Sequence, residues 1–343
     1  MKSNDRKKIT IYDVAKHAGV APGTVSRTIN NIGYIKSETR KKVMESVGAL
    51  GYIPNMAGRT LKTTKTGLIC LAIPDTSNAI YFRMIESVLE VAKQHSYSMV
   101  LYYTNGLEEE ELKVIRILQE SIVDGLFMVH FSYSNRLRTA IDSCMQPIVL
   151  CGMCDNLWAG QEERNFDTVS INVSKGIYQS TSFLIDHGHK DIVYLAGKKG
   201  IEVYSQRYEA FRRALFDHKM QFSEDCVFWH GYDEEAGYLA GMHFIYKHHI
   251  PTAVCASNDL QAIGFYKAMK EHKIKMPEIV GMDNLEMTDI LGISSMNMFE
   301  AEMGRRAAEL VFLRMKDPFV ELPPQDEMFV PELIDRSEQS GWI

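Results

Sequence analysis

Residues 10–30 read TIYDVAKHAGVAPGTVSRTIN, and this stretch predicts two short helices joined by a tight turn. Thr10 and Asp13 have the spacing of a capping box at the start of the first helix. Apolar residues follow at helical intervals, and Gly19 suits the left-handed position that ends a helix. Pro22 suits the first turn of the second helix. The pattern is typical of a helix-turn-helix.

A third helix is predicted from Ser37 onward, and the segment around the three helices is basic. Residues 1–66 hold 13 Lys and Arg against 4 Asp and Glu, a balance of +9, whereas the rest of the chain has a balance of −15. A small helical bundle without a DNA role would show the same apolar spacing. Because only this head is positive, the charge favours a domain that binds duplex DNA.

These residues closely resemble the head of the lactose/galactose repressor (LacI/GalR) family. The matching positions are residues 10–15, 18–20, 24–27 and 50–55, together with Asn30, Arg59 and Leu61. The resemblance is strong over the first 61 residues and continues, more weakly, over nearly the whole chain. It implies a transcriptional regulator, expected to be a repressor, that binds a pseudo-palindromic operator as a homodimer in the cytoplasm.

The resemblance places the second helix in the major groove, with Pro22, Gly23 and Arg27 at the positions that read bases. Pro22 and Gly23 have no side-chain hydrogen-bonding groups, and Arg can bond both O6 and N7 of guanine. We therefore expect specificity to depend on Arg27. The sequence departs from the family at Ala21, where a serine usually caps the helix. Residues implied to touch phosphates or brace the turn are Tyr12, Thr24, Ser26 and Asn30.

Residues 54–62 are predicted to form one short hinge helix, followed by a polar linker to residue 66. About eight residues are too few for a stable isolated helix, so this segment needs a partner to fold. The resemblance implies that Asn55 and Arg59 contact DNA and that Leu61 wedges into the minor groove. A plain polar linker is the alternative. The expected domains are residues 1–53, the hinge 54–66, and an effector-binding and dimerisation domain from 67 to 343.

From Gly67 onward, apolar strands alternate with amphipathic helices, which predicts doubly wound parallel sheets in two lobes. The strand-like runs are residues 68–73, 98–103, 125–129, 148–151, 169–171, 192–196, 227–229, 253–256 and 279–282. Helical stretches between them include residues 81–94, 109–120, 175–186, 207–217, 234–248, 260–271 and 302–315. The chain is thus expected to join an all-α head to a two-lobed α/β body, and the body resembles the periplasmic-binding-protein-like (type I) domain of the same family.

Ligands of such sheets bind beyond the carboxyl ends of the strands, where Asp75, Asn258, Asp259 and Asp283 fall. Taken singly, each of them could instead cap the next helix. Carboxylates and an amide suit a ligand rich in hydroxyl or NH groups. The resemblance assigns effector contacts to Arg207, Asn258 and Asp283, and less directly to Asp75 and Tyr81. Trp158 is expected either to stack on a sugar ring or to pack in a lid.

Other functions are disfavoured. The pair Cys151 and Cys154 lacks a second CxxC, and the His187-Gly-His189 turn is expected to be structural, so no metal or other cofactor is predicted. No nucleophile elbow or P-loop is present. No apolar run would span a bilayer, and the charged start, residues 1–8, does not look like a secretion signal. The alternative is a solute-binding protein or an enzyme on the same fold. A protein corepressor stays open.

Overall fold

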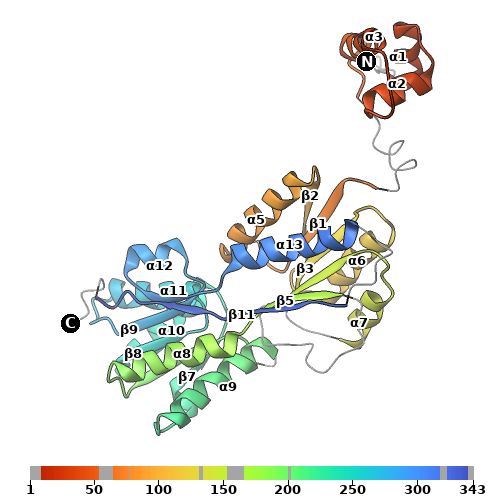
Figure 1. Ribbon diagram of the computed structural model, residues 1–343. Coiled ribbons are helices and arrows are strands. Elements are labelled where there is room, and N and C mark those ends of the chain that lie inside the picture. Colours follow the sequence, from red (N-terminus) through yellow and green to blue (C-terminus); the bar gives the residue numbers. More distant parts are fainter. Residues whose placement is uncertain are drawn as a thin grey trace, which may run out of the picture. The chain divides into compact units, whose positions relative to one another are not determined.

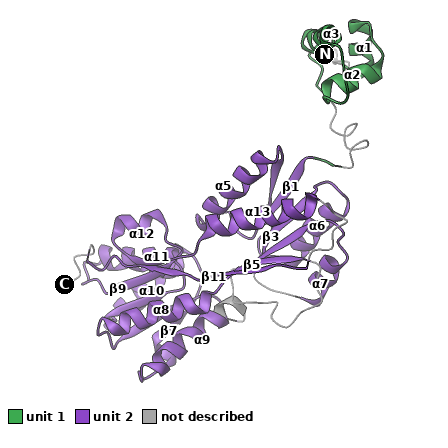
Figure 2. Cartoon of the chain, viewed as in Figure 1, with its two compact units in different colours: residues 1–66 green, residues 67–343 purple. Residues whose placement is uncertain are grey.

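The computed structural model describes residues 9–53, 65–76, 78–130, 134–152, 166–199, 202–316 and 323–338. The chain divides into two compact units, residues 1–66 and residues 67–343 (Figure 2). The first unit contains the helices α1 (Ile11–Ala18), α2 (Pro22–Ile29) and α3 (Ser37–Leu50). We call this unit the head and the second unit the body.

The start of α1 is the predicted capping box. The Asp13 N–H donates to Thr10 Oγ1 at 3.4 Å, and the Thr10 N–H donates to Asp13 Oδ2 at 2.8 Å. Gly19 ends the helix in the left-handed conformation, with φ 65°. Ala21 precedes α2 without a side-chain cap, and Pro22 occupies the first turn. The predicted helix-turn-helix is therefore confirmed at both of its helices.

The core of the head is small. Val14, Val25 and Val43, one from each helix, are fully buried together. His17 Nδ1 lies 3.0 Å from Ser46 Oγ, which links α1 to α3 across this core. Because every helix contributes to the same cluster, α1 and α3 hold α2 in one orientation and leave its outer face free for contacts.

The body contains two six-stranded sheets (Figure 1). The first has the order β11-β5-β4-β3-β1-β2, from β1 (Leu68–Ile73), β2 (Ser98–Tyr103), β3 (Gly125–His130), β4 (Ile148–Gly152), β5 (Asp167–Ile171) and β11 (Asp326–Phe329). The second has the order β12-β10-β9-β8-β6-β7, from β6 (Ile192–Ala196), β7 (Val227–Trp229), β8 (Ala253–Ala256), β9 (Glu278–Met282), β10 (Ser294–Asn297) and β12 (Glu332–Ile334).

Helices cover both sheets and define two lobes. The first sheet carries α5 (Ile80–Gln94), α6 (Glu108–Gln119), α7 (Asn135–Asp142) and α13 (Glu300–Lys316). The second carries α8 (Val173–Asp186), α9 (Glu202–Asp217), α10 (Glu234–Tyr246), α11 (Asp259–Glu271) and α12 (Glu286–Leu291), with the short 3-10 helix η1 (Glu224–Cys226) before β7. In the first lobe, α5 and α13 lie side by side (Figure 1).

Strand β1 has a continuous apolar run because both of its faces are buried. Its odd-numbered residues Ile69, Leu71 and Ile73 share a buried cluster with α5 and α13. Its even-numbered residues Cys70 and Ala72 share a second cluster with α6 and α7. A parallel strand that is covered on both faces needs apolar residues at every position.

The sequence prediction missed β10, β11 and β12, and the one antiparallel pairing among the described strands joins two of these. β10 reads Ser-Ser-Met-Asn and is largely buried although three of its four residues are polar, so it shows no apolar run. β11 and β12 are short strands on the outer edges of the two sheets. β12 pairs antiparallel with β10, whereas every other described pairing is parallel, so the sheets are mostly parallel rather than wholly so.

The chain passes between the two sheets after β5, after β10 and after β11, and these crossings lie close together. The Asn172 N–H donates to Phe329 O at 3.0 Å, which joins the first crossing to the third. The rings of Phe299 and Phe329 are 6.3 Å apart, which joins the second crossing to the third. Phe299 has φ 54°, a conformation that is uncommon for a bulky residue. We call this set of segments the crossing region.

Helices α10 and α11 approach so closely that their backbones touch. A Cβ at Gly264 would lie 1.9 Å from Glu234 O. Gly264→Ala is therefore expected to destabilise the second lobe by about 3 kcal/mol, because the two helices would have to separate. Urea unfolding followed by far-UV circular dichroism measures the change. Gly48→Ala in α3, where a Cβ meets open space, is the control and should leave unfolding of the body unchanged. An unshifted midpoint for Gly264→Ala would contradict this packing.

No helix among the described residues has both the length and the apolar character that crossing a bilayer requires.

Candidate functional site

The outer face of the helix-turn-helix carries the predicted DNA contacts. Arg27 is exposed, and its Nε makes only a 3.4 Å contact to Gly23 O within α2. Tyr12 on α1 is 71% exposed. Asn30 donates through Nδ2 to Ser26 O at 2.8 Å, so it braces the end of α2. Arg27 and Tyr12 are thus positioned for a partner, while Asn30 is partly engaged within the head.

Of the remaining residues predicted to contact DNA, some lie in the described part of the head and others lie outside it. Pro22 and Gly23 lie in the first turn of α2, followed by Thr24, whose carbonyl oxygen accepts from Thr28 Oγ1 at 2.8 Å. The hinge predictions, Asn55, Arg59 and Leu61, fall outside the described residues, and so does Trp158.

In the second lobe, Ser257 directly follows β8 at the carboxyl edge of the sheet, and three side chains form hydrogen bonds with it. The Ser257 carbonyl oxygen accepts from Arg207 Nη1 at 2.6 Å and from the Tyr232 hydroxyl at 3.1 Å. The Arg207 guanidinium lies 5.4 Å from the centre of the Tyr232 ring. Ser257 Oγ in turn donates to the Tyr194 hydroxyl at 2.6 Å. Arg207 is almost completely buried here, and its Nε has no hydrogen-bond partner among the described residues.

Asn258 is held at the same edge through both its amide oxygen and its amide nitrogen. Its Oδ1 accepts from the Gln261 N–H at 2.9 Å, which makes it the N-cap of α11. Its Nδ2 donates to Tyr232 O at 2.7 Å. The alternative interpretation of Asn258 as a helix cap is therefore correct, and an effector contact for it remains a prediction.

Asp259, the first residue of α11, is a fully buried structural group. Its Oδ1 accepts from Ser295 Oγ at 2.6 Å, and its Oδ2 accepts from the Leu285 N–H at 2.7 Å and from Thr288 Oγ1 at 3.2 Å. Burial raises its pKa to about 6 against these three hydrogen bonds. Gly281 makes this possible, because a Cβ there would lie 2.1 Å from Asp259 Oδ1. Asp259 thus orders the loop that follows β9.

That loop presents Asp283 in a strained conformation. Asp283 and Asn284 have φ values of 120° and 50°, two consecutive non-glycine residues in the left-handed region. Asp283 is 2% exposed, and its Oδ2 has no hydrogen-bond partner among the described residues. Burial raises the pKa of Asp283 well above its ordinary range, the nearby Asp259 carboxyl adds to the shift, and the Arg207 guanidinium opposes it. A buried carboxyl without a donor is suited to a ligand that supplies one.

The first lobe approaches this loop through α5. Arg83 Nη2 donates to Asn284 O at 3.1 Å, so the two lobes are tied next to Asp283. Asp75 follows β1 at the carboxyl edge of the first sheet, and Tyr81 is buried in the first turn of α5. The structure therefore groups Arg207, Asn258 and Asp283 at one edge, while Asp75 and Tyr81 belong to the other lobe.

The sequence prediction missed several polar groups at this edge. They are Tyr232, Trp229, Arg83 and Glu300. The indole Nε1 of Trp229 is buried without a hydrogen-bond partner among the described residues. Two of these residues could have been suspected, because Trp229 ends a predicted strand and Tyr232 follows it. Nothing in the local pattern marks Arg83 or Glu300, which the fold brings to the edge from the first lobe and from the crossing region.

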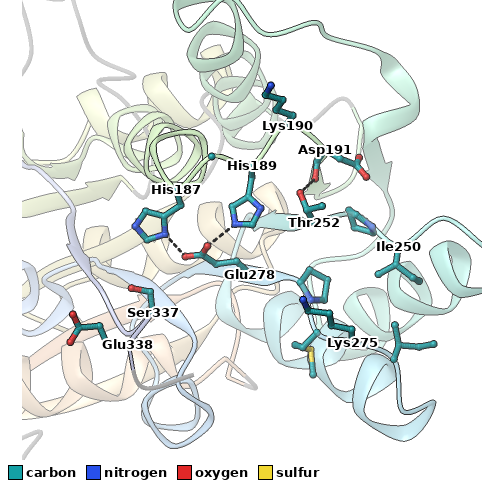
Figure 3. A pocket seen from close by; sticks show the side chains of 15 residues that line it. His187, His189, Lys190, Asp191, Ile250, Thr252, Lys275, Glu278, Ser337 and Glu338 are labelled. Atoms are coloured by element: carbon teal, nitrogen blue, oxygen red, sulfur yellow. Dashed lines mark hydrogen bonds and ion pairs between the residues drawn. The ribbon is translucent and has the colours of Figure 1, made fainter. Parts of the chain in front are cut away.

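A large cavity, about 980 Å³, lies at the opposite edge of the second sheet (Figure 3). Its lining includes Glu278, the first residue of β9, whereas Asp283 follows the last residue of that strand. His187 Nδ1 and His189 Nε2 each lie 2.7 Å from one oxygen of the Glu278 carboxyl group. Both rings point at that carboxyl (Figure 3).

The Glu278 cluster of this cavity is internally satisfied. Each of its carboxylate oxygens already has an imidazole partner, and no group of three His, Cys, Asp or Glu among the described residues could hold a metal ion. The cluster ties the turn after α8 to the start of β9, in keeping with the predicted structural turn. At the carboxyl edge, by contrast, Arg207 Nε and Asp283 Oδ2 are buried without a hydrogen-bond partner among the described residues.

Comparisons with known proteins cover both units. The profile described as "Bacterial regulatory proteins, lacI family" matches residues 10–55, and that of a "Periplasmic binding protein-like domain" matches residues 181–337. The HTH-type transcriptional repressor PurR of Vibrio cholerae serotype O1 (strain M66-2) is 30% identical over 314 residues, which cover 90% of this chain and 92% of that protein. The HTH-type transcriptional regulator RegA of Clostridium saccharobutylicum is 30% identical over 275 residues, 80% of this chain and 81% of that protein.

Solved structures share the fold. A LacI-family transcriptional regulator from Silicibacter pomeroyi superposes with a TM-score of 0.82 at 23% identity, over 95% of this chain and 98% of that one. The lac repressor dimer bound to operator and the anti-inducer ONPF superposes with a TM-score of 0.80 at 20% identity, over 96% of this chain and 98% of that one.

Proposed function

The chain belongs to the lacI family of bacterial regulatory proteins, DNA-binding transcriptional repressors with an effector-binding domain, and from this premise we propose how its two units divide the work. The head reads one half of a pseudo-palindromic operator in the cytoplasm. The body binds a small polar effector, a carbohydrate or a derivative, beyond the carboxyl ends of its strands. The observation that carries this proposal is the joint presence of an exposed basic reading helix and a buried polar site in one chain.

The DNA half of the proposal rests on α2. Arg27 is the exposed guanidinium on that helix, and it can form two hydrogen bonds to one guanine. The proposed phosphate contacts, through Tyr12, Thr24 and Ser26, position the helix without reading sequence. Hinge residues 54–66, with Asn55, Arg59 and Leu61, would enter the minor groove.

A homodimer is proposed because the first lobe exposes an apolar edge. β2 is an outer strand of its sheet, and Val100, Leu101 and Tyr103 on it are exposed, with Phe82 of α5 also exposed. An exposed apolar strand at the edge of a sheet is suited to association with a second copy of the chain. Two copies would supply the two heads that a palindrome requires. The lac repressor in the fold comparison is itself a dimer bound to operator.

The effector half rests on the unpartnered polar atoms. Asp283 Oδ2 can accept a hydrogen bond, while Arg207 Nε and Trp229 Nε1 can donate one. A ligand with both hydroxyl donors and oxygen acceptors satisfies all three, which favours a carbohydrate. Binding between the lobes would change their angle at the crossing region and so alter the hinge, a coupling that must act in both directions.

Selection of binding sites from a randomised palindrome pool tests the DNA half with the full chain. We expect one palindrome to be enriched, and its affinity to fall steeply with salt because every neutralised phosphate contributes about −0.9 to the slope of log K against log salt. Sedimentation of the complex should show two chains per duplex. Enrichment of no sequence over random duplex at either of two salt concentrations would refute the proposal.

A further inference from the structure

Glu300 is a second buried carboxyl group beside Asp283, and no motif points to it. It is the first residue of α13, directly after Phe299 in the crossing region. It is 2% exposed, and its Oε1 has no hydrogen-bond partner among the described residues. Glutamate is almost never fully buried unless it is paired, so a partner is missing from this position.

The charged groups around Glu300 leave the site with an excess of acid. Asp283 faces it from the loop after β9, Asp259 from α11, and Glu302 from its own helix. Arg83 of α5 opposes them, but Arg83 is exposed and lies against the Asn284 loop. Burial is the largest cause that raises the pKa of Glu300 from its ordinary value of 4.5 to about 7. Two buried cations lie near, but Arg336 is engaged with Asn284 and Asp289. Arg207 is therefore the buried cation that acts on Asp283, while Glu300 and Asp283 each have an open oxygen.

We propose that Glu300 and Asp283 together bind a protonated amine of the effector, so that an amino sugar or a related cationic polyol is the class of molecule this site accepts. The inference rests on the proposed function, in which the effector binds at this carboxyl edge. An ammonium group has three donors and no acceptor, which matches two open carboxylate oxygens. The hydroxyl groups of the same molecule would reach Arg207 and Trp229.

Proton release follows from this arrangement. Without a ligand, Glu300 is partly protonated near pH 7, because burial raises its pKa to about 7, and burial likewise raises the pKa of Asp283 and favours its protonated form. A cation next to them favours the carboxylate form, so its binding expels protons. Affinity should therefore rise as the pH rises, by up to about tenfold per unit for each proton released. An uncharged polyol would show no such rise.

Calorimetry of the full chain at pH 6 and pH 8 tests this with matched probes. The pairs are 1-amino-1-deoxysorbitol against sorbitol and 1-amino-1-deoxygalactitol against galactitol. A primary alkyl amine stays protonated over this range, as a lysine does. At least one amine is expected to bind more than tenfold tighter than its partner at pH 8, and about tenfold tighter at pH 8 than at pH 6.

Glu300→Gln assigns the effect to its carboxyl group. The variant should lose most of the preference for the amine and most of the pH dependence of binding. Glu111→Gln is the matched control, because burial also raises the pKa of Glu111 to about 7, but Glu111 lies on α6. It should bind the amine as the parent chain does.

A readout without ligand checks that Glu300 is buried in solution. Its pKa is higher in the folded chain than in the unfolded chain, so the folded state binds more protons between pH 4.5 and pH 7. Stability therefore falls as the pH rises through this window, and Glu300→Gln should lessen that fall. An unaltered pH profile of the thermal midpoint would overturn the proposal.

The binding outcomes separate this proposal from the function on which it rests. Equal binding of amine and uncharged members would overturn the amine assignment and keep a carbohydrate effector. Binding of none of the four probes would overturn the assigned ligand class, while operator selection would still report on the repressor. Retained amine preference in Glu300→Gln would exclude Glu300 as its cause.

Discussion

Arg207→Ala is expected to weaken effector binding by at least a hundredfold and so to abolish the response of operator binding to effector. Arg207 is buried, and its guanidinium is the cation whose charge opposes the raised pKa of the strained Asp283 carboxyl. Its removal would leave that carboxyl without an opposing charge, and the loss of one partner of a buried charged pair costs about 2–5 kcal/mol. Calorimetry with an effector found by thermal-shift screening measures the loss directly.

The matched control for this prediction is Arg213→Ala on the same helix. Arg213 is largely exposed and lies 3.7 Å from Asp217, a contact of little energetic value in water. It should bind effector as the parent chain does. Effector-free operator binding should be similar in both variants, because the head is a separate compact unit. Unchanged effector affinity in Arg207→Ala would remove the carboxyl edge as the effector site.

The head was predictable from sequence because its signals are local. The capping box at Thr10, the left-handed Gly19 and the proline at the start of α2 each act within one helical turn, so neighbouring residues are enough to reveal them. The same holds for β1, whose continuous apolar run reflects burial on both faces. Tertiary packing brings these helices and this strand together without changing the conformation that their local sequence favours.

The site was predictable only in part, because its chemistry depends on residues distant in sequence. The rule that ligands bind at carboxyl ends located Asn258 and Asp283, but it could not show that Asn258 caps α11, and its effector contact stays a prediction. β10 escaped prediction since its serines are buried by hydrogen bonding, Ser295 to Asp259 among them. Glu300 reaches the site from the crossing region, an arrangement that no local pattern encodes.

Arg27→Ala is expected to reduce discrimination between the selected operator and a variant with one changed base pair by about 5- to 150-fold, the equivalent of about 1–3 kcal/mol for a bidentate contact to guanine. The helix itself should survive, because Arg27 is exposed and its Nε makes only a long 3.4 Å contact with Gly23 O in the described part of the head. Binding to the operator and to random duplex should then converge, and gel-shift titrations against both DNAs measure the ratio.

Lys41→Ala on α3 is the control that distinguishes the loss of a base contact from the loss of one positive charge. Lys41 is also an exposed cation of the head, but it lies outside the reading helix. Its removal should weaken binding to both DNAs by the same factor, since a phosphate contact carries no sequence information. If Arg27→Ala behaved like Lys41→Ala, with both affinities lowered and their ratio preserved, specificity would have to arise elsewhere. The neighbouring Pro22 and Gly23 offer no side-chain donors for it, so the hinge or the shape of the DNA would then be the remaining source.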